Sequence, residues 1–110
     1  MRQYVIDEIK PHEIDRIKEY LDRHFEQSVM GGVYWILIDQ DILNDTQKQH
    51  TDCQPFYFAV ELLTDRLACE FLVRTRNRMR CSCMENADER QRNWFIDFAD
   101  SIFERLEIKF

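Results

Sequence analysis

The sequence predicts an α+β domain, a two-layer sandwich in which a mostly antiparallel sheet of four to five strands packs against two long helices. Three observations point to this class. Two stretches, at about 11–28 and 86–106, repeat apolar residues at helical spacing. Other apolar runs are short or alternate with polar residues, as strands do. Three of these runs follow one another closely, which is typical of antiparallel hairpins under helices. The expected order is β-α-β-β-β-β-α.

The length and composition are those of one small folded domain, expected to span residues 1–110. Aromatic residues are plentiful, whereas only two Gly and two Pro occur, which argues against disorder. A formal net charge of -6 makes nucleic acid and anionic membranes unlikely partners. No apolar run approaches the ~18 residues of a membrane span, and the first residues lack an apolar signal-peptide core. We therefore expect a cytoplasmic protein with reduced thiols.

The first third of the chain is expected to form a strand at 2–9, a helix at 11–28 and a strand at 33–38. Pro11 suits the first position of a helix, where its missing N–H has no cost. Gly31-Gly32 is expected to end this helix. The strand that follows is apolar on both faces, as expected of a central strand. The apolar residues at helical spacing are Ile14, Ile17, Leu21 and Phe25.

A polar stretch at 39–54 comes next, in which Asn44 and Gln47 have the spacing of a cap for one or two helical turns. Strands are then expected at about 56–63, 66–75 and 79–85. A two-residue turn between the first two brings apolar residues together on one face. The pairs are Leu62 with Leu67, Val60 with Cys69, Phe58 with Phe71, and Phe56 with Val73. A turn at 76–78 continues that face by pairing Val73 with Cys81 and Phe71 with Cys83.

The last helix is expected to begin near Asn86, with Glu89 in a variant of the capping box, and to end at about Leu106. Its apolar residues spread over roughly 200° at ~100° per residue, whereas a helix on one sheet face needs a stripe of about 100°. The apolar surface of this helix beyond that stripe must be covered by the first helix, the 39–54 stretch or a second subunit. Large apolar patches often mark interfaces. The candidate interface residues are Trp94, Ile96 and Phe103. The other face of the sheet also mixes apolar residues, namely Ala59, Leu63, Ala68 and Leu72, with charges.

Arginines alternate along the second predicted hairpin, at Arg74, Arg76, Arg78 and Arg80. The predicted register sets the first opposite the last, and like charges that face each other across strands destabilise the pair. Glu61 or Glu70, an acidic partner or a bound anion should offset this repulsion. A surface salt-bridge network is one interpretation. The alternative is an anion or nucleic-acid binder that uses the arginines of hairpin 74–80.

Four cysteines occur, at positions 53, 69, 81 and 83. The predicted register places Cys69, Cys81 and Cys83 on the apolar sheet face, where a free Cys behaves as a small hydrophobic residue. A C-x-C pair also departs from the usual zinc knuckle. We therefore expect no cofactor and no metal ligand. The alternative is a metal or thiol site that uses His50, Cys53, Cys81 and Cys83.

No catalytic residues are predicted. No sequence argument places a nucleophile beside His12 or His24, and nucleophilic catalysis needs nucleophile, base and orienting group together. The acidic residues are numerous enough for close pairs to arise by chance. The interpretation that remains is a non-enzymatic cytosolic binding protein, adaptor-like or chaperone-like, that forms a homodimer or binds a protein partner. This comparison rests on size, charge and element content alone.

Overall fold

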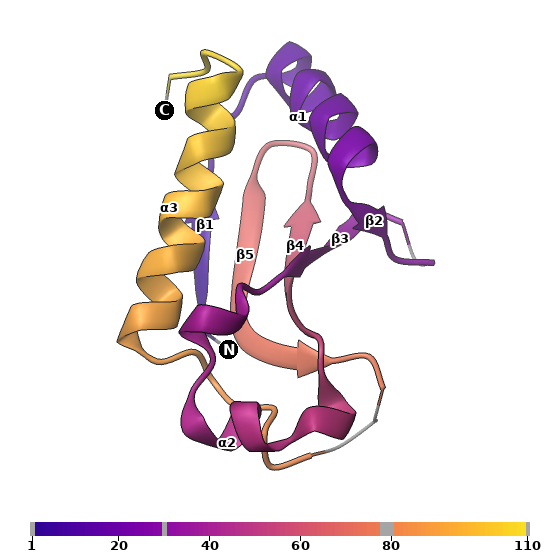
Figure 1. The fold of residues 1–110 in the computed structure, drawn as a ribbon. Helices are drawn as coiled ribbons and strands as arrows, with labels where there is room; N and C mark the ends of the chain where they lie inside the picture. Colours follow the sequence, from indigo (N-terminus) through magenta and orange to yellow (C-terminus); the bar gives the residue numbers. More distant parts are fainter. Residues whose placement is uncertain (1, 30, 78–80, 110) are drawn as a thin grey trace.

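A computed structural model describes residues 2–29, 31–77 and 81–109. It shows an antiparallel five-stranded sheet in the order β1-β5-β4-β3-β2, with two long helices (Figure 1). The strands are β1 (Gln3–Ile6), β2 (Glu26–Gln27), β3 (Val33–Leu37), β4 (Phe56–Leu62) and β5 (Leu67–Thr75). The helices are α1 (Pro11–His24), α2 (Asp45–Gln49) and α3 (Glu89–Arg105), with 3-10 turns η1 (Gln40–Ile42) and η2 (Thr51–Cys53). The predicted α+β class is confirmed.

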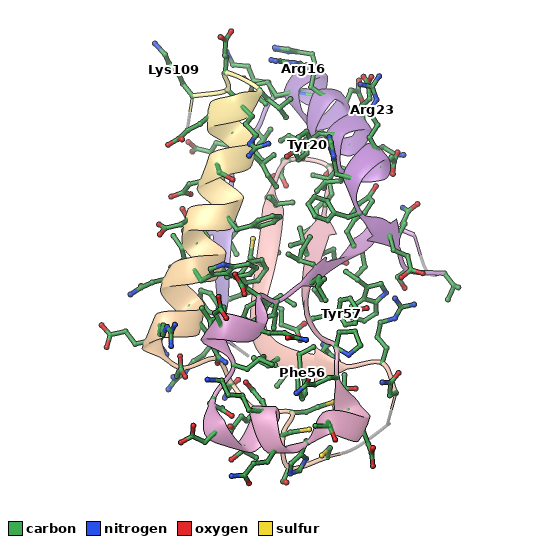
Figure 2. The ribbon with its side chains drawn as sticks, in the orientation of Figure 1. Arg16, Tyr20, Arg23, Phe56, Tyr57 and Lys109 are labelled. Atoms are coloured by element: carbon green, nitrogen blue, oxygen red, sulfur yellow. The ribbon has the colours of Figure 1, made fainter. Side chains whose placement is uncertain are left out.

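The core lies between the sheet and the two long helices. Helix α1 contributes Ile17 and Leu21, both fully buried. Helix α3 contributes Phe95, whose ring stacks on that of Phe58 from β4 at a centroid distance of 4.2 Å. Arg16 of α1 lies near the C-terminal end of α3 (Figure 2). Its guanidinium donates a hydrogen bond to the Leu106 carbonyl, which ties the helices together. Both helices thus cover the same sheet face. In the described part of the chain, no helix is long and apolar enough to cross a bilayer.

The central hairpin confirms the first part of the predicted register. Leu62 pairs with Leu67, and Val60 pairs with Cys69. A bulge between Tyr57 and Ala59 then shifts the register, so that Phe56 pairs with Thr75 and not with Val73. Side chains alternate with a period of two, so this two-residue shift leaves the same residues facing the core. Phe56 and Val73 are accordingly buried, although the predicted pair is wrong.

The prediction of a third strand at 79–85 is wrong for residues 81–85, the part of this segment that the structure describes. The chain forms a turn after residue 81 and rejoins β5 only through an isolated bridge between Leu72 and Asn86. The Val73 amide donates to the Glu85 carbonyl at 3.0 Å, so Val73 is not paired with Cys81, nor Phe71 with Cys83. The β5 edge at Phe71 and Val73 is instead taken by residues 85–87, since the Ala87 amide also donates to the Phe71 carbonyl at 2.7 Å.

The first predicted helix is too long. Helix α1 ends at His24, and Glu26–Gln27 forms the short edge strand β2 against β3. Gly31 and Gly32 have φ values of +74° and +72°, so they turn the chain between these two strands and do not end a helix. β3 lies between β4 and β2, as expected of an inner strand, but only Tyr34 and Ile36 are buried. Leu37, which points to the other face of the sheet, is 57% exposed.

Helix α3 begins three residues later than predicted. Its cap is Asp88, whose carboxylate accepts from the Gln91 amide at 2.8 Å, while the Gln91 side chain accepts from the Asp88 amide at 3.1 Å. Asn86 cannot start the helix because it forms the bridge to Leu72. The wide apolar arc of α3 is largely covered by the chain itself. Phe98, for example, meets the Phe25 ring edge-on at 5.5 Å.

Candidate metal centre

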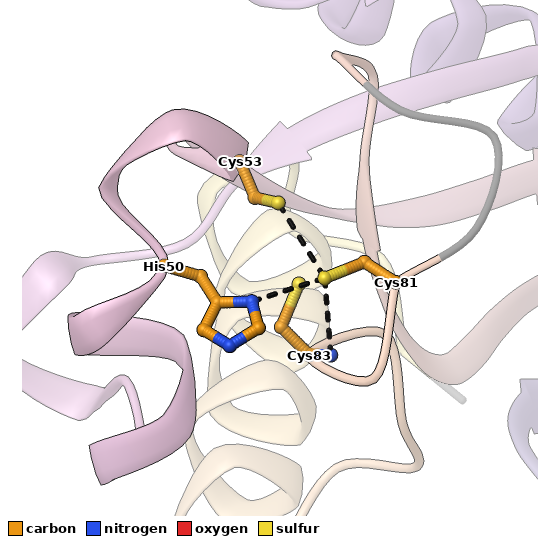
Figure 3. A group of neighbouring side chains, drawn as sticks. All are labelled: His50, Cys53, Cys81 and Cys83. Carbon is orange, nitrogen blue, oxygen red and sulfur yellow. Dashed lines mark hydrogen bonds between the residues drawn. The ribbon is translucent and has the colours of Figure 1, made fainter.

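Four side chains from two distant loops meet at one end of the sheet (Figure 3). His50 and Cys53 lie between α2 and β4, whereas Cys81 and Cys83 lie between β5 and α3. Their ligand atoms all lie within 4.8 Å of one another. The Cys81 sulfur is central to the group. It lies 3.0 Å from His50 Nδ1 and 3.6 Å from Cys53 Sγ, and it accepts from the Cys83 amide at 3.5 Å.

The first loop places His50 and Cys53 on the same side of one tight turn. Helix α2 has the predicted capping box between Asn44 and Gln47. It ends at His50, and the Cys53 amide donates to the His50 carbonyl at 3.0 Å to form the turn η2. Residues three apart in a 3-10 turn eclipse each other. The His-x-x-Cys spacing therefore points both side chains at the second loop.

A pair of buried glutamines holds the second loop in place. Gln47 Nε2 donates to the Cys83 carbonyl at 3.3 Å, and its Oε1 accepts from Gln91 Nε2 at 2.8 Å. Gln91 also donates to the Ile42 carbonyl at 3.1 Å. Both glutamines are fully buried, and within the described chain no buried side-chain N or O atom lacks a hydrogen-bond partner. This network joins α3, α2 and the Cys83 backbone into one support.

Hydrogen bonds at the end of β5 join the two loops on the other side of the cluster. The Thr75 hydroxyl donates to the Cys53 carbonyl and accepts from the Asn77 amide at 3.1 Å. Asn77 Nδ2 donates to the Gln54 carbonyl at 2.8 Å. Thr75 is 6% exposed, so its bond to the Cys53 carbonyl is buried, whereas the bond from Asn77 to Gln54 lies at the surface. Both sides of the cluster are thus positioned by groups that are not themselves candidate ligands.

The surroundings shift the pKa values of the Cys81 and Cys83 thiols in opposite directions. Hydrogen bonds from the Cys83 thiol and backbone amide lower the pKa of Cys81, and contacts with His50 and Cys53 act in the same direction. Burial raises the pKa of Cys83. A thiolate at Cys81 is therefore stabilised, and the thiolate is the form that binds metals. Cys69 lies apart from the cluster in β5, where burial raises the pKa of its thiol to about 12.

The donor set and spacing are those that Zn²⁺ prefers. Three thiols and one imidazole form a Cys3His set, which is one of the common structural zinc sets. Zn–S bonds of about 2.3 Å in a tetrahedron place neighbouring sulfurs about 3.8 Å apart. The Cys53 and Cys81 sulfurs are 3.6 Å apart, which fits this geometry. Four protein ligands leave no open position on the ion, so the site is of the structural type and not the catalytic type.

These are the residues named in the metal alternative of the sequence analysis. Two arguments spoke against that alternative: the unusual C-x-C spacing, and a third strand that would have turned Cys81 and Cys83 into the sheet face. That strand is wrong, and Cys81 is half-buried beside His50. Cys69 does lie in the core as predicted, at 1% exposure. The usable sequence signal was the pairing of a His-x-x-Cys segment with a Cys-x-Cys segment.

Two of the four predicted arginines can be placed, and both have acidic partners. Arg74 forms an ion pair with Glu70, as the sequence argument anticipated. Arg76 forms an ion pair with Glu26 across the sheet. The Arg76 guanidinium also lies over the Trp35 and Tyr57 rings, 5.4 and 5.5 Å from their centroids. Arg78 and Arg80, and with them the proposed facing of Arg74 and Arg80, lie outside the described residues.

The three predicted interface residues differ in exposure. Phe103 is fully buried within its own chain, so it is not at the surface, and the prediction is wrong for this residue. Trp94 and Ile96 are half-buried. Trp94 stacks on Phe98 at 5.9 Å and lines a cavity of about 470 Å³ beside η1. Most of the excess apolar surface of α3 is therefore buried without a second subunit.

The sheet face that points away from α1 and α3 is partly apolar. Of the four large hydrophobic side chains found exposed in the described residues, three belong to this face: Val5, Leu37 and Leu63. The fourth, Val29, lies in the β2–β3 turn. A shallow groove of about 280 Å³ crosses the face. It is lined by Trp35 and the small residues Ala59 and Ala68, together with Glu61, Glu70 and Arg74.

The chain was compared with protein-family models, curated proteins and solved structures, and none of these comparisons gives a significant match. Its function is therefore argued from the geometry of its own residues.

Proposed function

We propose that this protein is a non-enzymatic zinc-binding domain in which His50, Cys53, Cys81 and Cys83 hold one structural Zn²⁺. The observation that carries the proposal is the convergence of the four ligand atoms within 4.8 Å. Cysteines that are buried only to fill the core do not need an imidazole beside them. Here His50 Nδ1 lies 3.0 Å from the Cys81 sulfur. Thiolate ligands also require a reducing environment, which agrees with a cytoplasmic location.

The role of the ion would be to join two loops that are 28 residues apart in the chain. Helix α2 has only five residues, and a helix this short is not stable on its own. The turn that contains Cys83 has no strand partner that could hold it. Metal binding adds to folding stability because the assembled site exists only in the folded chain. Zinc would therefore fix the end of the molecule that is farthest from the contact between α1 and α3.

The test is the zinc content of protein purified under reducing conditions without chelator. We expect about one Zn²⁺ per chain by elemental analysis. Cys53→Ser and Cys81→Ser should each lower the bound zinc substantially. Cys69→Ser is the matched control, because this buried thiol lies outside the cluster, and it should retain zinc. Metal-free wild-type protein after incubation with Zn²⁺, or equal zinc in all three variants, would contradict the proposal.

A second candidate function concerns the open sheet face. We propose that this face contacts a second copy of the chain. It combines exposed Val5, Leu37 and Leu63 with both signs of charge, and a two-fold interface must be complementary to itself. Anion binding through Arg74 and Arg76 has less support, because both are already paired with carboxylates.

Sedimentation velocity over a concentration series tests this second candidate. The wild-type protein should associate as concentration rises, and Leu37→Glu should prevent this, because it places a charge in the apolar contact. Val29→Glu is the control, since Val29 is fully exposed but lies in the β2–β3 turn, outside the strands and the lining of the groove. A protein that stays monomeric at all concentrations would rule out self-association.

A further inference from the structure

We propose that the metal centre is sensitive to oxidants: a hydroperoxide converts Cys53 and Cys81 into a disulfide, and Zn²⁺ is released. This inference rests on the proposed zinc site and adds its regulation. The observation behind it is the 3.6 Å distance between the two sulfurs, which come from different loops. A disulfide between them would replace the zinc link by a covalent link between the same loops.

The exposure of the three cysteines indicates where the reaction begins. Cys81 is half-buried, whereas Cys53 and Cys83 are only 2% and 0% exposed. We therefore expect an oxidant from solvent to react first at Cys81. Metal-bound thiolates remain nucleophilic enough to react, since the thiolate is the reactive form of cysteine.

The partner in the second step is expected to be Cys53. Cys83 is separated from Cys81 by a single residue, and a disulfide between such close neighbours is strained. Cys83 is also held by the bond from Gln47 Nε2 to its carbonyl. The Cys53 sulfur already faces Cys81, as Figure 3 shows.

The chemistry balances in two steps. The Cys81 thiolate attacks one oxygen of the hydroperoxide, so an S–O bond forms, the O–O bond breaks, and hydroxide or alkoxide leaves. The resulting sulfenic acid is then attacked by the Cys53 thiolate, which forms the S–S bond and expels hydroxide. Two thiolates lose two electrons in total, the peroxide gains them, and protons from water neutralise the leaving groups. Only His50 and Cys83 would then remain as ligands, which are too few for a stable zinc site.

The experiment uses the full, zinc-loaded chain and hydrogen peroxide as the probe. Zinc bound before oxidation is measured first, and zinc released afterwards is followed with a chromogenic chelator. Trypsin separates the cysteines into peptides 49–66, 67–74 and 81–90. Mass spectrometry then identifies cross-linked peptides, and fragmentation between Cys81 and Cys83 locates the bond. Cys69→Ser is the matched control and should behave as the wild type does.

We expect zinc release in proportion to a Cys53–Cys81 disulfide, and rebinding of zinc after a dithiol reductant is added. Zinc that stays bound while the thiols remain reduced would overturn this inference and leave the zinc site intact. Release that accompanies only a different disulfide, or only irreversible sulfinic acid, would also overturn it. A chain that holds no zinc before peroxide is added would remove both proposals.

Discussion

Gln47 is a buried amide whose contacts join three parts of the molecule. Its side chain accepts from the Asn44 amide at 3.0 Å and from Gln91 Nε2 at 2.8 Å, and it donates to the Cys83 carbonyl at 3.3 Å. A buried polar group that loses its partner costs about 1–3 kcal/mol. Gln47 therefore supports the candidate metal centre without being one of its candidate ligands.

Gln47→Ala should lower the free energy of unfolding by about 2–3 kcal/mol, because it leaves buried groups of Gln91 and Cys83 without partners. Zinc affinity should fall about 10–100-fold, as is usual when the groups that orient metal ligands are removed. Urea unfolding and a competitive zinc titration measure the two effects. Gln49→Ala is the control, since Gln49 is exposed on the same helix. Equal behaviour of the two variants would show that the network has no supporting role.

The hydroxyl of Tyr34 makes the free energy of unfolding depend on pH in the alkaline range. Its ring is fully buried, and its hydroxyl donates to Asp22 at 2.6 Å. Burial and the Asp22 carboxylate raise its pKa from 10.0 to about 12. The folded state therefore favours the neutral phenol, so this contribution is complete below pH 10 and is lost as the pH rises towards 12.

Tyr34→Phe should cost about 1–2 kcal/mol at neutral pH, because the hydrogen bond to a charged acceptor is lost. Above pH 10 the variant should lose less stability than the wild type, since the shifted group is absent. Urea unfolding at several pH values between 7 and 11.5 checks both effects. Identical pH slopes for the two proteins would contradict the assignment.

Helix α3 depends on its cap. Asp88 and Gln91 exchange side-chain and backbone hydrogen bonds at its first turn. Asp88→Ala should destabilise the protein by about 1 kcal/mol, the usual effect of removing such a cap. Thermal or urea unfolding measures the change, and Asp97→Ala, at an exposed position within the same helix, should have little effect. A cap variant as stable as the Asp97 variant would be the contrary result.

The elements that the sequence predicts well are those with local signals. The Asn44–Gln47 cap and the pairing of Leu62 with Leu67 depend on residues close in sequence, and both are present. The bulge at Tyr57 was not predictable, because a two-residue shift leaves the alternation of apolar residues unchanged. β2 was missed because two residues are too few to show a pattern.

The error that mattered for function was non-local. Residues 79–85 alternate like a strand, but the described part of this segment turns and rejoins the β5 edge through the bridge between Leu72 and Asn86. Cys81 lies beside His50, which is 31 residues earlier in the chain. No local pattern could show that residues this far apart in sequence would meet. The four candidate ligands were named from the sequence as an alternative, but their convergence could not be derived from it.

On the scale of the whole molecule, the zinc proposal predicts uneven stability. The two loops of the candidate metal centre contribute Cys53 and Cys83 to the core, but they lie at one end of it and contain only short helical turns. Removing zinc should therefore loosen this end of the fold more than the rest. With free zinc at 100 times the dissociation constant, binding contributes about 2.7 kcal/mol. A chelator should therefore lower the melting temperature of the reduced protein.

Hydrogen exchange can locate this effect. After zinc removal, amides in α2 and in residues 81–87 should exchange faster, whereas those of β4 and β5 between Val60 and Cys69 should change little. Cys69→Ser should show the same contrast, because its thiol is not a ligand. A uniform change across the chain, or none at all, would contradict a local role for the metal.

The most direct measurement is X-ray absorption fine structure at the zinc edge of the reduced, zinc-loaded protein. A Cys3His site should give about three sulfur neighbours at about 2.3 Å and one nitrogen at about 2.0–2.1 Å. Cys81→Ser should reduce the sulfur count, whereas Cys69→Ser should leave it unchanged. A spectrum with only oxygen and nitrogen neighbours would show that these cysteines do not hold the metal.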